Sequence, residues 1–318
     1  MKLQTKIEIK KSASTISYSD KVLFIGSCFA NEVGSIMKNL RFDVIVNPFG
    51  VLYNPASIAE SLERLVSGRH FENEDFIKCD DIYKSFSHSS DFSAMCLDEL
   101  RSNVNRQLDE ASIHFKQSKW IILSLGTRWI YRLCSNGKVV ANCQKLPPNR
   151  FEREPLDVDD VVRLLSPLIA ENPMKNWILT VSPVRHWKDG AHGNQLSKAV
   201  LLLSIEKLQN LHENVHYFPA YEILLDELRD YRFYSEDMLH PSGQAVNHIW
   251  NIFSDIFMDL PSLEFMKIIS KLNTMDGHRP FFPDSKSYVM FDKERKELEK
   301  AVKEKLEYFR SLTSSNNV

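Results

Sequence analysis

Short apolar runs alternate with longer amphipathic ones along most of this chain, and this alternation constrains its fold more than any other feature. The apolar runs have the length of strands, whereas the segments between them repeat apolar residues at helical spacing. The pattern predicts strands at 22–26, 42–47, 120–126, 177–184 and 215–218, and helices at 28–40, from Asn54 onward, and at 97–117, 157–171, 194–212, 220–230 and after Pro241. Parallel strands need a connection long enough to hold a helix. The sequence therefore predicts a doubly wound α/β protein with a mainly parallel central sheet.

Two further regions depart from this alternation. Residues 68–118 open with a polar, aromatic stretch, which we interpret as an excursion over the site at the top of the sheet, and then become helical. Asn136-Gly137 lies between two strand-like runs and predicts a hairpin. No clean linker divides the chain, so we expect one domain over 1–260 and a C-terminal helical extension over 261–318.

Charge narrows the classes of partner. The chain carries 40 basic and 42 acidic side chains, and its isoelectric point is about 6.6. This balance gives no reason to expect nucleic acid or an anionic membrane as a partner and fits a small neutral substrate better. The N-terminus lacks the apolar run and cleavage site of a secretory signal, and no stretch approaches the roughly 18 apolar residues of a membrane span. We therefore expect a cytoplasmic protein.

The five cysteines are odd in number and form no CxxC motif. Neither a disulfide framework nor a zinc site is indicated by such spacing. We expect free thiols, no bound metal and no cofactor.

Residues suited to chemistry follow several of the predicted strands. Ser27 follows the first strand, Asn47 to Gly50 the second, Gly126 to Trp129 the third, and Arg185 with His186 the fourth. In doubly wound sheets, ligands bind at the carboxyl ends of the strands. We therefore expect these residues to surround a common site.

Ser27 gains meaning from a motif near the other end of the chain. A serine at a junction between strand and helix is by itself more often a helix cap than a nucleophile. However, Asp237 and His240 stand three residues apart in "SEDMLHPSG". A carboxylate at this spacing can orient the imidazole, whose other nitrogen can then face a serine hydroxyl. Together the three residues predict a catalytic triad.

Five stretches in order along the chain resemble one protein family. They are "GSCFA" at 26–30, "NPFGVLYNP", "LGTRW", "SPVRH" and "DMLHPS", and the resemblance spans roughly residues 20 to 255. The GSCFA domain family carries these stretches and resembles the wider SGNH hydrolase superfamily of esterases, lipases, carbohydrate deacetylases and O-acyltransferases. The resemblance implies a flavodoxin-like, three-layer α/β/α sandwich with an insertion and a C-terminal extension. It implies a class of mechanism and leaves the substrate open.

The resemblance also assigns roles to residues. Ser27 takes the nucleophile position, His240 that of the general base and Asp237 that of the orienting carboxylate. The backbone N–H groups of Gly50 and Ser27 would form the oxyanion hole. Arg128 stands where many SGNH enzymes place an asparagine that completes this hole. Its guanidinium could donate to the oxyanion, hold an anionic group of the substrate, or pair with a surface acid.

Other residues have weaker assignments. Cys28 is one position further into the helix, so its side chain should turn about 100° away from that of Ser27 and toward the core. The aromatic rings of Phe233 and Tyr234 are expected to pack rather than to form a platform for sugars. The residues that we expect to bind substrate are Asn47, Thr127, Arg185, His186 and His88, the last as part of the excursion.

These assignments predict a serine-dependent ester hydrolase or O-acyltransferase that acts on a small or carbohydrate-linked ester. His240 would take the proton of Ser27, and the alkoxide would attack the ester carbonyl to form an acyl-serine intermediate. Water or another hydroxyl would then accept the acyl group. The alternative is a binding or scaffold protein that keeps the fold without catalysis, an alternative that the altered third motif supports.

Overall fold

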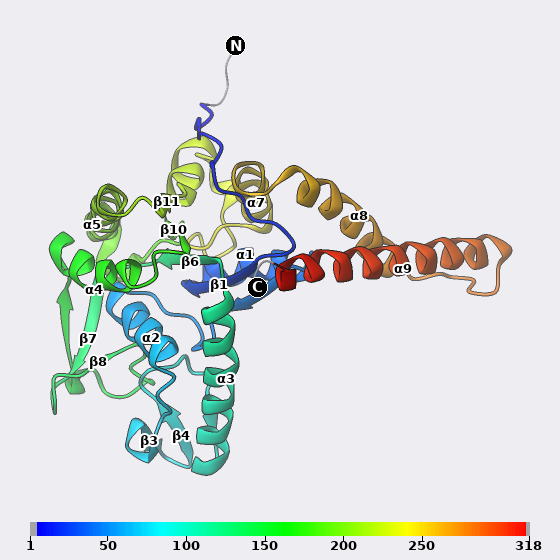
Figure 1. Ribbon diagram of the computed structural model, residues 1–318. Coiled ribbons are helices and arrows are strands. Elements are labelled where there is room, and N and C mark those ends of the chain that lie inside the picture. The colour runs from blue at the N-terminus through cyan, green and yellow to red at the C-terminus, as the bar shows by residue number, and fades with distance from the viewer. Residues whose placement is uncertain (1–4, 316–318) are drawn as a thin grey trace.

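A five-stranded parallel sheet forms the centre of the protein (Figure 1). The structure, a computed structural model, describes residues 5–315. The strands run in the order β11 (Val215–Tyr217), β10 (Asn176–Val181), β6 (Trp120–Leu125), β1 (Lys21–Gly26) and β2 (Asp43–Val46). Every neighbouring pair is parallel. Counted within this sheet alone, the order is 2-1-3-4-5, that of flavodoxin-like folds. The predicted α/β class is confirmed.

Helices cover both faces of the sheet and complete a three-layer α/β/α arrangement (Figure 1). Alternate residues of β1 serve the two cores: Val22 and Phe24 point to one, Leu23 and Ile25 to the other. The first core is covered by α1 (Cys28–Asn39), α7 (Gly243–Phe257), α8 (Leu260–Asp276) and α9 (Lys286–Ser315), and the second by α2 (Pro55–Ser67), α3 (Leu97–Gln117), α4 (Val158–Ala170) and α5 (Gly190–Leu211). The central strands are buried on both faces, which explains their continuous apolar sequences.

The order of the strands locates the expected site. β1 pairs with β2 on one side and with β6 on the other, so the chain reverses its direction of winding between β1 and β6. A crevice for ligands opens outside the carboxyl ends of the strands at such a switch point. Residues that follow β1, β6 and β10 are therefore placed to meet there.

Two small antiparallel sheets extend the sandwich. One contains β3 (Phe76–Cys79), β4 (Ile82–Ser85) and β5 (Ser93–Ala94), and the other contains β7 (Trp129–Leu133), β8 (Val139–Val140) and β9 (Phe151–Pro155). β3 and β4 lie beyond α2, at the lower end of Figure 1. The predicted hairpin forms as β7 and β8, with Gly137 at a positive φ of 69° in its turn. β9 was not predicted.

The C-terminal extension packs on the sandwich through parts of its two helices. Phe265 of α8 and Phe309 of α9 both contact the ring of Tyr18. The first turns of α9 project away from the sheet (Figure 1). Among residues 5–315, no helix combines the length and apolar character needed to cross a lipid bilayer.

Candidate active site

The turn that ends β1 is held rigidly by neighbouring backbone. Gly26 has a φ of +143°, and a Cβ there would lie 2.2 Å from the carbonyl oxygen of Ser124, so this position requires glycine. The Gly26 N–H donates to Oδ1 of Asn47 over 2.8 Å, and Nδ2 of Asn47 donates to Oδ1 of Asn31 over 2.6 Å. Asn47 therefore joins the ends of β1 and β2 to α1, and its amide is occupied by structural contacts.

Ser27 follows at the N-cap of α1, and both of its donor groups point to β6. Its N–H donates to the carbonyl of Ser124 over 3.0 Å. Its Oγ lies 2.9 Å from Oγ of Ser124, and the residue is only 1% exposed. The N–H group that was predicted to serve the oxyanion hole is therefore already hydrogen-bonded, and the predicted nucleophile is buried.

Cys28 is the first residue of α1, and it is more exposed than Ser27. It packs against the core beneath α1 but remains only partly buried. Burial raises the pKa of its thiol, while the backbone N–H groups of Phe29 and Cys28 and the charge of Lys198 act in the opposite direction. The effect of burial prevails, so the thiol is less acidic than a free cysteine even though it stands at a helix N-terminus, where backbone donors favour a thiolate.

Asp237 and His240 form the expected pair in the turn before α7. Nδ1 of His240 lies 2.6 Å from Oδ2 of Asp237, and each side chain is 46% exposed. Oδ1 of Asp237 accepts the N–H groups of Leu239 and His240 over 2.9 and 3.0 Å. Donation by these N–H groups and by the imidazole lowers the pKa of Asp237 to about 2, so the carboxylate is ionised and can fix the orientation of the ring.

The loop after β10 connects this turn to the switch point. The N–H of Arg185 donates to the carbonyl of Leu239 over 3.1 Å, and its Nη1 donates to the carbonyl of Met238 over 3.1 Å. The ring of His186 lies edge-on to Tyr53, with 5.8 Å between the centroids. Burial and then the charge of Lys198 lower the pKa of His186 to about 4, and His240 contributes in the same direction. His186 is therefore neutral. It lies close to Gly126 after β6 and is near enough to His240 for the two rings to interact electrostatically.

The components of the predicted triad lie on neighbouring elements, but the structure does not join them. Among residues 5–315, no hydrogen bond connects His240 to Ser27 or to Cys28. A catalytic contact would have to form when the turn of His240 moves or when substrate binds. Catalytic hydrogen bonds are often long before substrate is present.

Lys198 is a site residue that the sequence did not reveal. It lies on α5, is fully buried, and donates from Nζ to the carbonyls of Gly126 and Ser182 over 2.8 and 2.7 Å. Burial lowers the pKa of its ammonium to about 7. It ties the ends of β6 and β10 together beneath the site. A lysine in an amphipathic helix pattern gives no sequence signal for such a role.

Two further predicted binding groups are occupied by the fold. The N–H of Gly50 donates to the carbonyl of Asn47 over 2.8 Å and is not free for an oxyanion, which corrects the predicted role. Gly50 is needed for its φ of +76° and for its contact with Ser89, whose Oγ would lie 2.0 Å from a Cβ. Oγ1 of Thr127 lies 3.2 Å from Oγ of Ser197 and accepts a hydrogen bond from the N–H of Trp129.

Arg128 lies in the loop between β6 and β7, and its guanidinium forms no hydrogen bond with the described residues. Its backbone N–H donates to Oγ of Ser197 over 3.0 Å, which fixes the chain. Nε is buried without a hydrogen-bond partner, and no ion pair of the guanidinium occurs among residues 5–315. The guanidinium carbon lies 5.6 Å from the centroid of the Trp129 ring. The structure therefore gives no support to pairing with a surface acid.

His88 does not cover the site as predicted. It is 1% exposed, and its ring lies among those of Phe49, Phe71 and Phe92, with centroids 5.3, 4.8 and 4.8 Å away. Nδ1 lies 2.8 Å from Oγ of Ser85. Burial lowers the pKa of the imidazole to about 3. His88 is a neutral core residue behind the loop that follows β2.

Comparison with known proteins fits the motifs described above. A model of the GSCFA family matches residues 21–253. The chain belongs to the GSCFA family. No curated protein sequence matches it. A solved structure of a Streptococcus pneumonia protein proposed as a platelet activating factor is similar, with 13% sequence identity, coverage of 73% of this chain and 82% of that chain, and a TM-score of 0.36. That TM-score is too low for the likeness to support a conclusion about activity.

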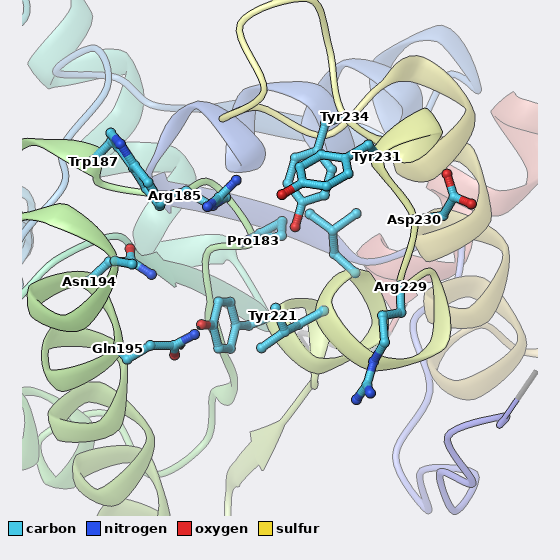
Figure 2. Close-up of a pocket in the computed structure, with 13 residues that line it drawn as sticks. Pro183, Arg185, Trp187, Asn194, Gln195, Tyr221, Arg229, Asp230, Tyr231 and Tyr234 are labelled. Atoms are coloured by element: carbon cyan, nitrogen blue, oxygen red, sulfur yellow. Dashed lines mark hydrogen bonds between the residues drawn. The ribbon is translucent and has the colours of Figure 1, made fainter.

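This GSCFA chain also has a cavity of about 260 Å³ beside the His240 turn (Figure 2). None of Ser27, Gly50, Arg128 or His240 lines it. Its lining residues are Pro183, Arg185, Trp187, Ala191, Asn194, Gln195, Tyr221, Leu224, Leu225, Arg229, Asp230, Tyr231 and Tyr234. Most of this set was not predicted from the sequence, because its members come from four separate stretches of the chain. Phe233 and Tyr234 both pack against the core as expected, and Tyr234 also lines the cavity.

Proposed function

We propose that the chain is an ester hydrolase or O-acyltransferase that works through a covalent acyl-enzyme intermediate. The observation that carries the proposal is the 2.6 Å contact between Nδ1 of His240 and Asp237, on a turn hydrogen-bonded to the loop after β10. Two nucleophilic side chains, those of Ser27 and Cys28, follow the carboxyl end of β1, which is separated from β10 by β6 in the sheet. An oriented base and a nucleophile at a helix N-terminus are the parts that acyl transfer requires.

The roles follow from the hydrogen bonds. Asp237 holds the proton of His240 on Nδ1, which leaves Nε2 free to accept a proton from the nucleophile. The nucleophile forms a bond to the carbonyl carbon of the ester, and the alkoxide leaves with the proton that Nε2 returns. Water, or the hydroxyl of an acceptor, then attacks the acyl-enzyme with His240 again as base. Arg128, whose Nε has no hydrogen-bond partner among the described residues, would donate to the oxyanion.

The family resemblance implies Ser27 as the nucleophile, but two observations favour Cys28. The hydroxyl of Ser27 is buried against Ser124, whereas the side chain of Cys28 is partly exposed. The N–H of Ser27 is bound to Ser124, whereas that of Cys28 belongs to the first helical turn, where no intrahelical acceptor exists. A nucleophile commonly uses its own N–H for the oxyanion, and Cys28 can do so without rearrangement.

Covalent labelling tests the proposal and separates the two residues. Wild type, Ser27→Ala and Cys28→Ala would each be treated with a fluorophosphonate and with a panel of activated esters, and adducts would be located by mass spectrometry. An acyl adduct on residue 27 or 28 that disappears in His240→Ala supports the proposal. Cys96→Ala is the matched control, because Cys96 is exposed and lies at the start of α3. A folded wild type that forms no adduct and hydrolyses no ester would support the non-catalytic alternative.

A further inference from the structure

The cavity beside His240 shares its wall with the proposed catalytic turn. Tyr234 lines the cavity, and it forms an isolated antiparallel bridge with Pro241, the residue that follows His240. Arg185 also lines the cavity, with its guanidinium carbon 5.6 Å from the ring of Tyr234, and it donates to the carbonyls of Met238 and Leu239 within the same turn. A group bound in the cavity would therefore lie next to the base, at the position of a substrate's non-reacting part.

Aromatic rings form much of the cavity wall, and two of them are open to solvent. Trp187 is 46% exposed and Tyr231 is 69% exposed, although large aromatic rings usually gain free energy from burial. In Figure 2, the rings of Tyr231 and Tyr234 lie together on one side, with Trp187 across from them and Tyr221 below. Exposed rings arranged about a concave surface indicate a ligand-binding site.

Polar groups between the rings favour a hydroxylated ligand. The hydroxyl of Tyr221 donates to Oε1 of Gln195 over 2.7 Å, and Nε2 of Gln195 has no partner among the described residues. The guanidinium of Arg185 lies 4.1 Å from the ring of Trp187 and 5.6 Å from that of Tyr234. It donates from Nη1 to Met238, so its remaining N–H groups can donate to a ligand.

The other charged groups of the wall are already paired. Arg229 forms an ion pair with Asp226, and Asp230 forms one with Arg232. In Figure 2, the ends of Arg229 and Asp230 point away from the two tyrosines. The cavity therefore combines apolar ring faces with neutral hydrogen-bonding groups and one shared guanidinium.

We propose that this cavity binds a sugar ring, so that the ester acted upon is an O-acylated carbohydrate; this assignment rests on the proposed function. The C–H faces of a pyranose pack on the negative faces of aromatic rings, while its hydroxyls take the amide and guanidinium donors. A cavity of about 260 Å³ is slightly smaller than the roughly 300 Å³ at which pockets for drug-sized ligands begin, and it suits about one ring.

Other ligand classes fit this lining less well. A fatty acyl chain would leave the donors of Gln195 and Arg185 without partners, which costs free energy for buried polar groups. A polyanion such as a phosphate would have one shared guanidinium as its cation. A simple aromatic alcohol could stack on the rings but would leave the amide unused. These classes are the competing outcomes of the test.

Saturation-transfer NMR on the full chain tests the binding directly and needs no catalysis. The probes are the methyl glycosides of glucose, galactose, mannose, xylose and N-acetylglucosamine, with phenol and octanoate as competitors. At least one glycoside should bind, and Trp187→Ala and Tyr231→Ala should each weaken its binding about tenfold, the loss expected from one stacked ring. Gln195→Leu should weaken glycoside binding about fivefold but leave phenol binding unaltered. Tyr308→Ala is the matched control, because Tyr308 is exposed on α9.

Binding of phenol or octanoate alone would overturn the assignment, and so would wild-type affinity in both aromatic variants. Absence of binding by every glycoside at its limit of solubility would overturn it as well. Kinetics then link the cavity to the proposed function. The ratio of kcat/KM for the acetylated form of the bound glycoside to that for p-nitrophenyl acetate should fall about tenfold in Trp187→Ala and stay unchanged in Tyr308→Ala. Glycoside binding by a wild type that turns over no ester would refute the proposed function but leave the sugar site established.

Discussion

The two halves of the candidate site are built in opposite ways. The end of β1 is buried and fixed by backbone: Gly26 fits only as glycine, and both donors of Ser27 point to Ser124. The turn of Asp237 and His240 is half-exposed and held mainly by its own hydrogen bonds. The sheet fixes the position of Ser27, whereas a loop fixes the position of His240.

This difference assigns separate tasks to the two halves. A nucleophile needs an immobile setting, because small misplacements cost large factors in rate. A loop can move to bring a base toward the nucleophile when substrate binds. Damage to the turn should therefore change activity without changing stability, and damage to the end of β1 should change stability first.

The largest effect is expected from the turn. His240→Ala should lower kcat/KM for an ester substrate by at least about 10³-fold, because the proposed mechanism relies on His240, oriented by Asp237, as its base. The melting temperature should stay near that of wild type, since the pair is exposed. His70→Ala is the matched control, because His70 pairs with Asp109 at 2.8 Å on an exposed surface. Equal activity in the two variants would refute the role of His240.

Gly26→Ala should produce the next largest effect, on stability. A Cβ at this position meets the Ser124 carbonyl at 2.2 Å and requires an unfavourable φ, so we expect a loss of about 3 kcal/mol or more in the free energy of unfolding. Urea denaturation measures it. Gly68→Ala provides the contrast, because Gly68 also has a positive φ but no atom within 4 Å, and it should cost only about 1 kcal/mol. Similar losses in both would show that packing at β1 does not matter.

The central sheet could be predicted because its strands are buried on both faces and therefore carry continuous apolar sequences. β9 (Phe151–Pro155) could not be predicted in the same way. Its sequence is largely charged, and its pairing with β7 depends on residues about 20 positions away. Asp237 and His240 were recognisable because their contact is local.

The sequence could not show which donors of the site remain free. The N–H of Ser27 is bound by Ser124, and that bond exists only because β1 pairs with β6. The cavity escaped prediction for a similar reason, since Trp187 and Tyr231 line it together although α5 and β11 separate them along the chain. Buried Lys198 gave no signal, because its two carbonyl partners come from the ends of different strands.

Substitution of Arg128 tests whether the buried half of the site, at the end of the central strands, also stabilises the transition state. If its free guanidinium binds the oxyanion, Arg128→Ala should lower kcat about 10²-fold with little change in KM, and Arg128→Lys should recover part of the loss. Steady-state kinetics with one ester separates the two parameters. The control is Arg163→Ala, whose side chain is 72% exposed on α4. A change confined to KM would identify Arg128 as a substrate-binding residue, and unaltered kinetics would make it structural.

A last effect appears only on acidification and concerns the packing behind the loop that follows β2, where His88 is enclosed by three phenylalanine rings. Burial and the charge of Arg64 lower the pKa of His88 from 6.5 to about 3 in the folded protein. Above pH 6.5, the imidazole is neutral in both the folded and the unfolded state and adds no pH dependence. Between pH 6.5 and 3, the unfolded chain binds a proton that the folded protein does not, so acidification lowers stability by up to about 1.4 kcal/mol per pH unit.

His88→Gln removes this titration but also removes a packed ring, so the variant should be less stable than wild type at pH 7. The difference between the two free energies of unfolding should then narrow as the pH falls from 6.5 toward 3. Urea denaturation of both proteins at several pH values measures this difference. A gap that stays constant for His88→Gln would mean that the folded protein protonates His88 as readily as the unfolded chain does. The rings around it would then open easily, and this half of the site would be as mobile as the turn of His240.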